Sequence, residues 1–152
     1  MHPLDAPITE AGKGFRPMRP APGLLNRAMT ALVGFRINTM KMKVDPCAID
    51  QRVEDGTVLP LAGGITATHA PGHCLGQLAF LWPRHGGVLF AAETCGNMSK
   101  LDWSVAYENI AEGERSLQKL AKLDFQTACF GHGKPILKDA AARFRQRWSS
   151  PR

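Results

Sequence analysis

Short apolar runs bounded by glycine and proline dominate the chain after residue 57, and they predict β-strands. Leu78–Trp82 and Val88–Ala92 are nearly continuous in apolar residues and enclose the five-residue segment Pro83–Gly87, which is typical of a β-hairpin. Because neither run alternates with polar residues, both strands are expected to be buried on both faces. Further short strands are predicted at Val58–Leu61, Ile65–Thr68 and Thr127–Phe130.

Helical spacing of apolar residues predicts three helices. The first covers Leu24–Arg36, the second begins at a Ser104 N-cap and ends near Leu123, and the third is a basic helix over Asp139–Trp148. The apolar face of the first helix comprises Leu24, Leu25, Ala28, Leu32 and Phe35. The buried stripe of the second comprises Ile110, Gly113, Leu117, Leu120 and Ala121.

The remaining segments are less regular. Residues 1–23 contain five prolines and three glycines, so irregular chain is expected there. Ile37–Val44 alternates weakly and favours a strand. Together these elements predict an α/β domain in which helices cover a mixed sheet.

Composition is typical of one packed domain. The 152 residues, of which 44% are hydrophobic and 21% charged, suit a single domain with its own core. No apolar run reaches the roughly 18 residues of a membrane-spanning helix. The N-terminal residues, which include Asp5 and Glu10, lack the apolar run of a secretory signal, so we expect a cytoplasmic protein. Free thiols are expected at the four cysteines, none of which belongs to a C-x-x-C pair: Cys47, Cys74, Cys95 and Cys129.

The formal net charge is +6, and basic residues gather in the first 43 residues and after Leu137. Such ends attract phosphates or anionic substrates, although solvated surfaces are their commoner role. A nucleic-acid partner is the least favoured interpretation, because no aromatic residues interleave with the basic ones. A small-molecule substrate is the expected partner.

Three residues with metal-binding side chains each follow a predicted strand. His73, Glu93 and His132 all lie just beyond a strand's carboxyl end, beside glycine or another small residue. If these strands are neighbours in one sheet, their ends share a rim and the three side chains can converge. Two imidazoles and one carboxylate suit zinc, iron or manganese. Each alone is more often structural, and His85 is expected to be only a loop residue.

Three segments resemble the metal-binding motifs of the metallo-β-lactamase superfamily. Residues 68–78 (THAPGHCLGQL) resemble its HTPGHTPGxL motif, and residues 88–94 (VLFAAET) resemble its vLFxGD strand. Residues 128–133 (ACFGHG) resemble its last metal-binding motif. The segments occur in the family's order, and the resemblance extends over about residues 44–148.

The resemblance implies a site and a reaction. His73 would bind a first metal, Glu93 would bridge two metals, and His132 would bind the second, while His69 is a secondary residue that opens its motif. The implied cofactor is zinc, or iron or manganese, as one or two ions. The implied reaction is hydrolysis of an ester, lactone, thioester or amide by metal-bound hydroxide.

The sequence departs from the family at two points. The HxHxDH motif is absent, because no two histidines form an H-x-H pair, so none of its catalytic residues is present and the site is incomplete. The bridging carboxylate, usually Asp, is Glu93. The chain therefore resembles the C-terminal half of the family's αββα sandwich. Residues 1–43 form an irregular basic segment with one helix, and residues 44–152 form the half-domain.

Two functions stay open on this basis. One is a truncated metal-dependent hydrolase whose activity as an isolated chain is in doubt. The other is a non-catalytic remnant or protein-interaction module of the same fold. A half-sandwich exposes the inner face of its sheet, so we expect self-association as a dimer, or a complementing half, to cover that face.

Overall fold

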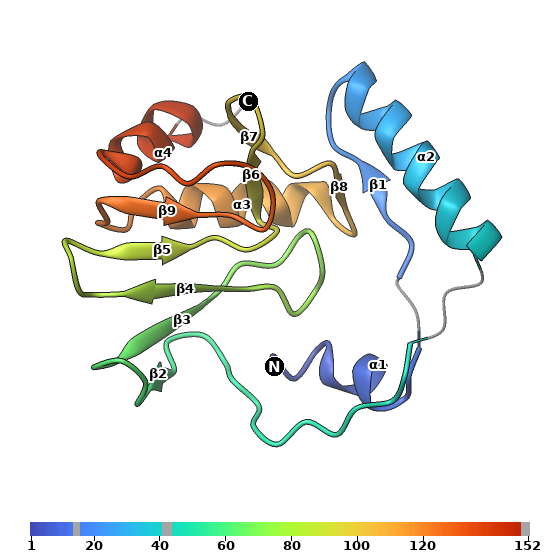
Figure 1. The fold of residues 1–152 in the computed structure, drawn as a ribbon, viewed down its shortest axis with the longest axis horizontal. Helices are drawn as coiled ribbons and strands as arrows, with labels where there is room; N and C mark the ends of the chain where they lie inside the picture. The colour runs from blue at the N-terminus through green and yellow to red at the C-terminus, as the bar shows by residue number, and fades with distance from the viewer. Residues whose placement is uncertain (14–15, 41–43, 150–152) are drawn as a thin grey trace.

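The centre of the chain is a five-stranded mixed sheet (Figure 1). The computed structural model describes residues 1–13, 16–40 and 44–149. The strand order is β2-β3-β4-β5-β9. The strands are β2 (Val58–Leu59), β3 (Ile65–His69), β4 (Leu78–Trp82), β5 (Val88–Phe90) and β9 (Thr127–Cys129). The predicted α/β fold, the five predicted strands and the β4–β5 hairpin are confirmed, although β2, β5 and β9 are shorter than predicted.

The strand directions bring three loops to one edge of the sheet. β3 and β5 both run antiparallel to β4, so they point the same way, and β9 is parallel to β5. All three strands therefore end at the same edge, on the right of the sheet in Figure 1. The shared rim expected from the sequence is confirmed, and the loops that carry His73, Glu93 and His132 all start there.

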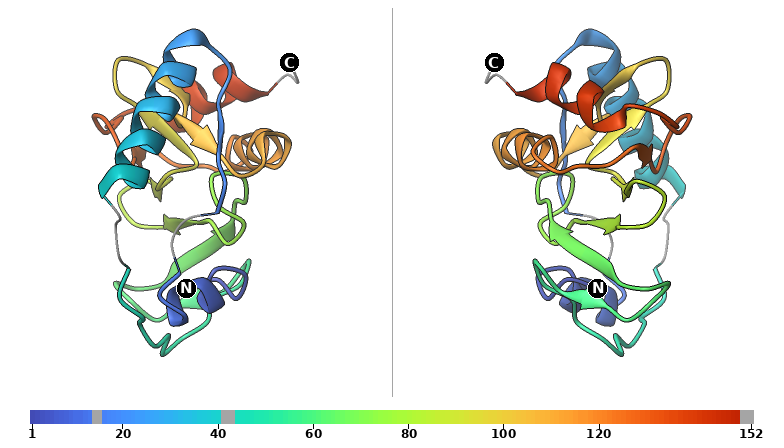
Figure 2. Two further views of the ribbon diagram at one scale, coloured as in Figure 1. Left: turned by 90° about the vertical axis from the view of Figure 1, so that its right-hand side faces the viewer. Right: turned by 90° about the vertical axis from the view of Figure 1, so that its left-hand side faces the viewer.

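Two helices cover one face of this sheet. α3 (Ile110–Leu120) and α4 (Ala140–Trp148) lie on the same side, as Figure 2 shows. Between them and the sheet, Leu89, Leu117 and Phe144 are fully buried, and each such side chain stabilises the fold by about 2 kcal/mol. The predicted stripe of α3 and the predicted C-terminal helix are confirmed, except that Ile110 is only half-buried.

The start of α3 differs from the prediction. Asn109, not Ser104, is the N-cap, and its side-chain oxygen accepts a hydrogen bond from the Glu112 N–H at 3.2 Å. The Ser104 N–H donates instead to the Tyr107 hydroxyl at 3.0 Å, just before β8 (Ala106–Tyr107). Serine and asparagine are equally good N-caps. The extended strand between them places the helix start at Asn109.

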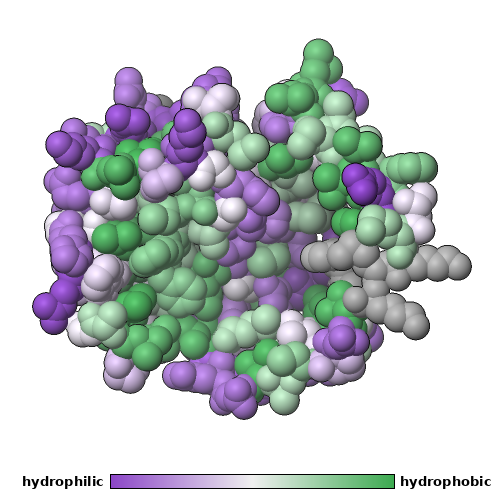
Figure 3. All heavy atoms as spheres, viewed as in Figure 1, coloured by the Kyte–Doolittle hydropathy of each residue, from purple (hydrophilic) through white to green (hydrophobic). Residues whose placement is uncertain are grey.

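The opposite face of the sheet is only partly covered. Cross-strand register places Ala67, Phe80, Phe90 and Cys129 in one row on this face. Val53 forms a small cluster with Ala67 and Phe80, but Phe90 is 40% exposed. Apolar residues gather over this face in Figure 3. Burial of the β4–β5 hairpin on both faces is therefore a wrong prediction, because α3 and α4 lie on one side only.

The N-terminal segment folds against the rest of the chain. It contains α1 (Ala6–Glu10) and β1 (Arg19–Pro20), and β1 pairs antiparallel with β8. The Met1 carbonyl accepts a hydrogen bond from the Val53 N–H at 2.9 Å. The prediction of irregular chain over residues 1–23 is therefore wrong for α1 and β1. The proposed domain boundary after residue 43 stays a prediction.

The first predicted helix is confirmed as α2 (Leu24–Met40) and is longer than expected. The strand predicted over Ile37–Val44 is wrong for residues 37–40, which are helical, and residues 41–43 lie outside the described residues. The apolar face predicted for this helix is largely exposed, with Leu24 84% and Phe35 67% exposed. Within the described ranges, no helix is long and apolar enough to cross a membrane.

A second hairpin follows β5 and is absent from the sequence-based prediction. It pairs β6 (Cys95–Asn97) with β7 (Leu101–Trp103) in antiparallel register. The four cysteines are free thiols, as expected, and Cys95 is buried at the start of this hairpin. The hairpin lies next to α4, which contacts β7.

Gly72 is expected to be essential for packing the loop that follows β3 against α3. It has φ of +141°, and a Cβ at this position would lie 2.4 Å from the Gly113 Cα in α3. Gly72→Ala should therefore lower the free energy of unfolding by about 3 kcal/mol. Gly34→Ala in α2, where the added Cβ meets nothing within 4 Å, is the control and should raise stability by about 0.5–1 kcal/mol. Urea unfolding followed by tryptophan fluorescence measures both, and an unchanged G72A midpoint would contradict the packing account.

Candidate metal centre

His73 is held in one orientation by a backbone carbonyl of β8 and a side-chain hydroxyl just before that strand. Its Nδ1 lies 2.9 Å from the Ala106 carbonyl oxygen and 3.4 Å from Ser104 Oγ. Since the carbonyl can only accept, Nδ1 carries the proton and Nε2 keeps its lone pair. A carbonyl on one ring nitrogen and a free lone pair on the other is the usual arrangement of a metal-binding histidine.

The loop that carries His73 is docked on the N-terminal end of α3. The Asn109 N–H donates to the Gly72 carbonyl at 3.0 Å, and the Glu108 N–H donates to the His73 carbonyl at 3.2 Å. Ser116 Oγ donates to the Pro71 carbonyl at 2.6 Å. These bonds fix the loop backbone, so the position of the imidazole is set by the helix rather than by the loop alone.

Glu93 follows β5 through a residue with unusual backbone geometry. Ala92 has φ of +47°, in the left-handed region that favours glycine, and it occupies the position of the glycine in vLFxGD. The Gly131 N–H donates to the Ala92 carbonyl at 2.9 Å. A Cβ on Gly131 would lie 2.0 Å from Glu93 Oε1, so this glycine makes room for the carboxylate.

His132 lies beside that carboxylate. Its Nε2 is 3.4 Å from Glu93 Oε1, and the two side chains are 70% and 31% exposed respectively. The His132 carbonyl accepts a hydrogen bond from the Asn97 N–H at 3.1 Å, which ties the loop after β9 to β6. The pair therefore presents one carboxylate and one imidazole together at the edge of the sheet.

Tyr107 connects the two parts of this edge. Its hydroxyl donates to the Thr94 carbonyl at 2.6 Å, one residue beyond Glu93, and its ring makes an edge contact with His73 at 6.2 Å between centroids. Burial raises the pKa of Tyr107 well above its usual value, so its hydroxyl stays a neutral donor. Sequence reasoning missed Tyr107; the one signal available is that it is the only tyrosine in the chain.

The predicted ligands are thus partly assembled. In the part of the chain that the structure describes, no three His, Cys, Asp or Glu side chains are close enough together to hold a metal ion. Glu93 and His132 are in contact, and His73 lies on the neighbouring loop. His69 is turned to another partner and stacks on His2 with ring centroids 4.0 Å apart. Convergence of all three predicted ligands on one ion stays a prediction.

A cavity of about 330 Å³ adjoins His73. Arg16 bridges two carboxylates on its wall, with Nη1 2.7 Å from Asp5 Oδ1 and 3.2 Å from Glu108 Oε2. Burial opposes ionisation of Asp5, but hydrogen bonds led by that from Arg16 outweigh it and lower the pKa of Asp5. The apolar part of the wall is formed by Met1, Ile8, Met18 and Val44.

Comparison with known proteins identifies the fold. No protein-family model and no curated protein matches the sequence. The chain superposes on the metallo-beta-lactamase family protein TTHA1429 from Thermus thermophilus with a TM-score of 0.62 and 23% identity, covering 97% of this chain and 50% of that one. It also matches the archaeal metallo-beta-lactamase superfamily protein ST1585 from Sulfolobus tokodaii, with a TM-score of 0.57 and 15% identity over 82% of this chain and 48% of that one.

A third match is the MIM-2 metallo-beta-lactamase, with a TM-score of 0.54 and 18% identity over 98% of this chain and 48% of that one. The chain therefore spans about half the length of the solved structures it matches. At these identities the comparison shows the fold, and the predicted half-sandwich of metallo-β-lactamase type is confirmed.

Ala92→Gly is expected to stabilise the protein, because it removes the left-handed strain next to Glu93. The free energy of unfolding should rise by about 1 kcal/mol. Ala91→Gly is the matched control, since Ala91 is fully buried and does not share the positive φ. That control should lose about 1 kcal/mol or more. Urea unfolding compares the two, and destabilisation of similar size in both variants would contradict the strain at Ala92.

Proposed function

We propose that this chain is the C-terminal half of a metal-dependent hydrolase of the metallo-β-lactamase superfamily and carries part of its metal site. The observation that supports it most is the 3.4 Å contact between His132 and Glu93 at the sheet edge where the His73 loop also begins. The substrate class is a small carbonyl compound, namely an ester, lactone, thioester or amide.

The donor types fit a transition metal. Two imidazoles and one carboxylate suit zinc, iron or manganese, and three protein ligands leave a position for water or substrate. Zinc held by these residues would supply a hydroxide nucleophile at neutral pH. His73 presents Nε2, Glu93 supplies the negative charge, and His132 supplies the second nitrogen.

The other side chains position these groups. The Ala106 carbonyl holds the His73 tautomer, and Gly131 leaves space for the Glu93 carboxylate. Tyr107 braces the Thr94 backbone next to Glu93. The apolar part of the wall of the cavity beside His73 suits the apolar body of a small substrate.

One observation favours the alternative, a non-catalytic protein-interaction module. Among the described residues, the three candidate ligands do not form a complete metal-binding group. In this alternative the shared sheet edge is a structural remnant, and no metal is retained. The two functions therefore differ in metal content before any substrate is tested.

Metal content tests the proposal. The purified chain, supplied with zinc and then desalted, should retain about one equivalent of zinc by plasma mass spectrometry. Glu93→Gln and His132→Gln should each fall below about 0.2 equivalents, because each removes a ligand. His85→Gln, an exposed loop histidine beside Trp82, is the control and should retain zinc like the parent chain.

Retention of zinc by E93Q and H132Q at the level of the H85Q control would contradict the assigned ligands. Hydrolysis of p-nitrophenyl acetate that rises and falls with zinc content across these variants would support the hydrolase. A parent chain that retains less than about 0.2 equivalents of zinc would favour the interaction module.

Self-association through the open face of the sheet belongs to the same proposal. The exposed Phe90 lies in the apolar row on this face, and the matched structures are about twice as long as this chain. We propose that a second copy of the chain covers this face. Size-exclusion chromatography with light scattering should give twice the mass of one chain.

Phe90→Asp is expected to convert this dimer to a monomer, because a charge in an apolar interface is costly. Leu137→Asp is the control, since Leu137 is 69% exposed and lies outside the row on this face. A parent chain that stays monomeric would contradict the dimer, and equal behaviour of the two variants would contradict this interface.

A further inference from the structure

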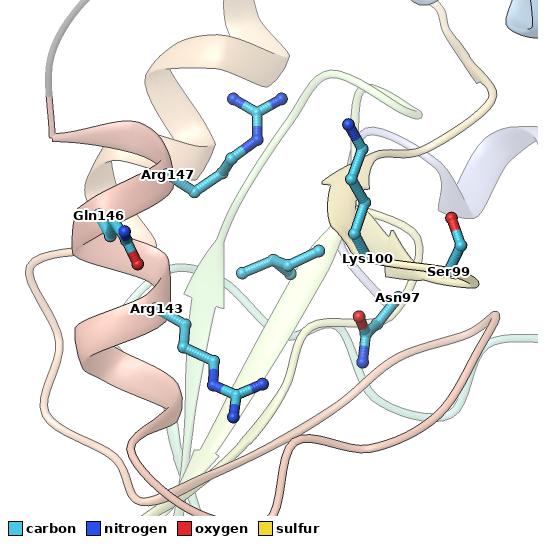
Figure 4. Close-up of a pocket in the computed structure, with 7 residues that line it drawn as sticks. Asn97, Ser99, Lys100, Arg143, Gln146 and Arg147 are labelled. Atoms are coloured by element: carbon cyan, nitrogen blue, oxygen red, sulfur yellow. The ribbon is translucent and has the colours of Figure 1, made fainter.

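A second cleft lies between α4 and the β6–β7 hairpin (Figure 4). Its volume is about 620 Å³, within the range of small-molecule sites. Arg143 and Arg147 extend from α4, and Lys100 extends from the hairpin on the opposite side. Three cationic side chains therefore border one cleft from two elements that are distant in the sequence.

These cations are only partly neutralised. Asp102 pairs with Arg147 and lies 3.5 Å from the Lys100 amino group. Within residues 1–13, 16–40 and 44–149, Arg143 forms no ion pair. One carboxylate thus pairs with two of the three cations, and the group keeps two uncompensated positive charges.

One of the three cations, Arg147, is preorganised. Arg147 is 19% exposed, and its guanidinium carbon lies 5.6 Å from the centroid of the buried Trp148 ring. Asp102 Oδ1 accepts a hydrogen bond from the Trp103 N–H at 2.9 Å, which holds the carboxylate toward Arg147. A guanidinium that is already ordered loses less entropy when it binds a ligand.

We infer that this cleft binds a small phosphorylated molecule. A phosphate monoester carries nearly two negative charges at neutral pH, which match the two uncompensated cations. Arginine donors fit phosphate oxygens in a forked geometry. The Ser99 hydroxyl and the Gln146 amide add neutral polar groups, and Leu101 adds apolar contact for an organic body.

A single-stranded nucleic acid is a weaker match. Such ligands stack their bases on aromatic side chains, and the lining of this cleft contains no aromatic residue among those described. The cleft also shares only β6 with the candidate metal centre and none of its predicted ligands. Failure of one site is therefore distinguishable from failure of the other.

Isothermal titration calorimetry with glycerol 3-phosphate at low ionic strength tests the inference, with inorganic phosphate as a second probe. The double variant Lys100→Gln/Arg143→Gln should weaken binding of glycerol 3-phosphate at least about tenfold. Lys138→Gln/Arg145→Gln is the matched control: it removes the same charge, and neither residue lines the cleft. The control should stay within about twofold of the parent chain.

The outcomes separate the sources of binding. Tighter binding of glycerol 3-phosphate than of inorganic phosphate supports an organic phosphate ligand. Equal binding of the two would show that the cleft recognises only the phosphate group and would contradict an organic ligand. No measurable binding, or equal weakening in both double variants, would overturn the inference. An oligonucleotide that displaces glycerol 3-phosphate, and that also binds the control double variant less tightly than the parent chain, would indicate that these basic residues bind nucleic acid instead. The zinc content of both variants should match that of the parent chain.

Discussion

The common direction of β3, β5 and β9 is the constraint on which the candidate metal centre depends. Backbone pairing sets this direction, since β4 runs antiparallel to both β3 and β5 and β9 is parallel to β5. The pairing carries three separate loops to one edge, and α3 and α4 bury the face behind it. Side chains far apart in the sequence thereby become neighbours, as the His132–Glu93 contact shows.

Much of this arrangement follows from local sequence. Apolar runs predict the five strands of the sheet, because each strand buries at least one face. Neighbouring elements decide the rest. Ser104 and Asn109 are both good N-cap residues before α3, and the helix starts at Asn109 because β8 lies between them. Phe90 is exposed because no helix lies over its side of the sheet, and this cannot be read from an apolar run.

The candidate site shows the same division between local and long-range information. Motif spacing selects His73, Glu93 and His132, but it does not reveal the carbonyl that sets the His73 tautomer or the tyrosine that braces the Glu93 loop. The basic cleft is equally non-local, since β8, α3 and β9 lie between the β6–β7 hairpin and α4 in the sequence. Long-range packing therefore supplies the supporting groups, and the sequence supplies the candidate ligands.

The central proposal is that His73, Glu93 and His132, on the three loops at this edge, bind a single zinc ion. A crystal structure of the zinc-loaded chain, with anomalous data at the zinc absorption edge, tests it most directly. The account predicts one peak about 2.0–2.2 Å from His73 Nε2, His132 Nε2 and a Glu93 oxygen. An anomalous peak bound by other residues, or no peak at this edge of the sheet, would contradict it.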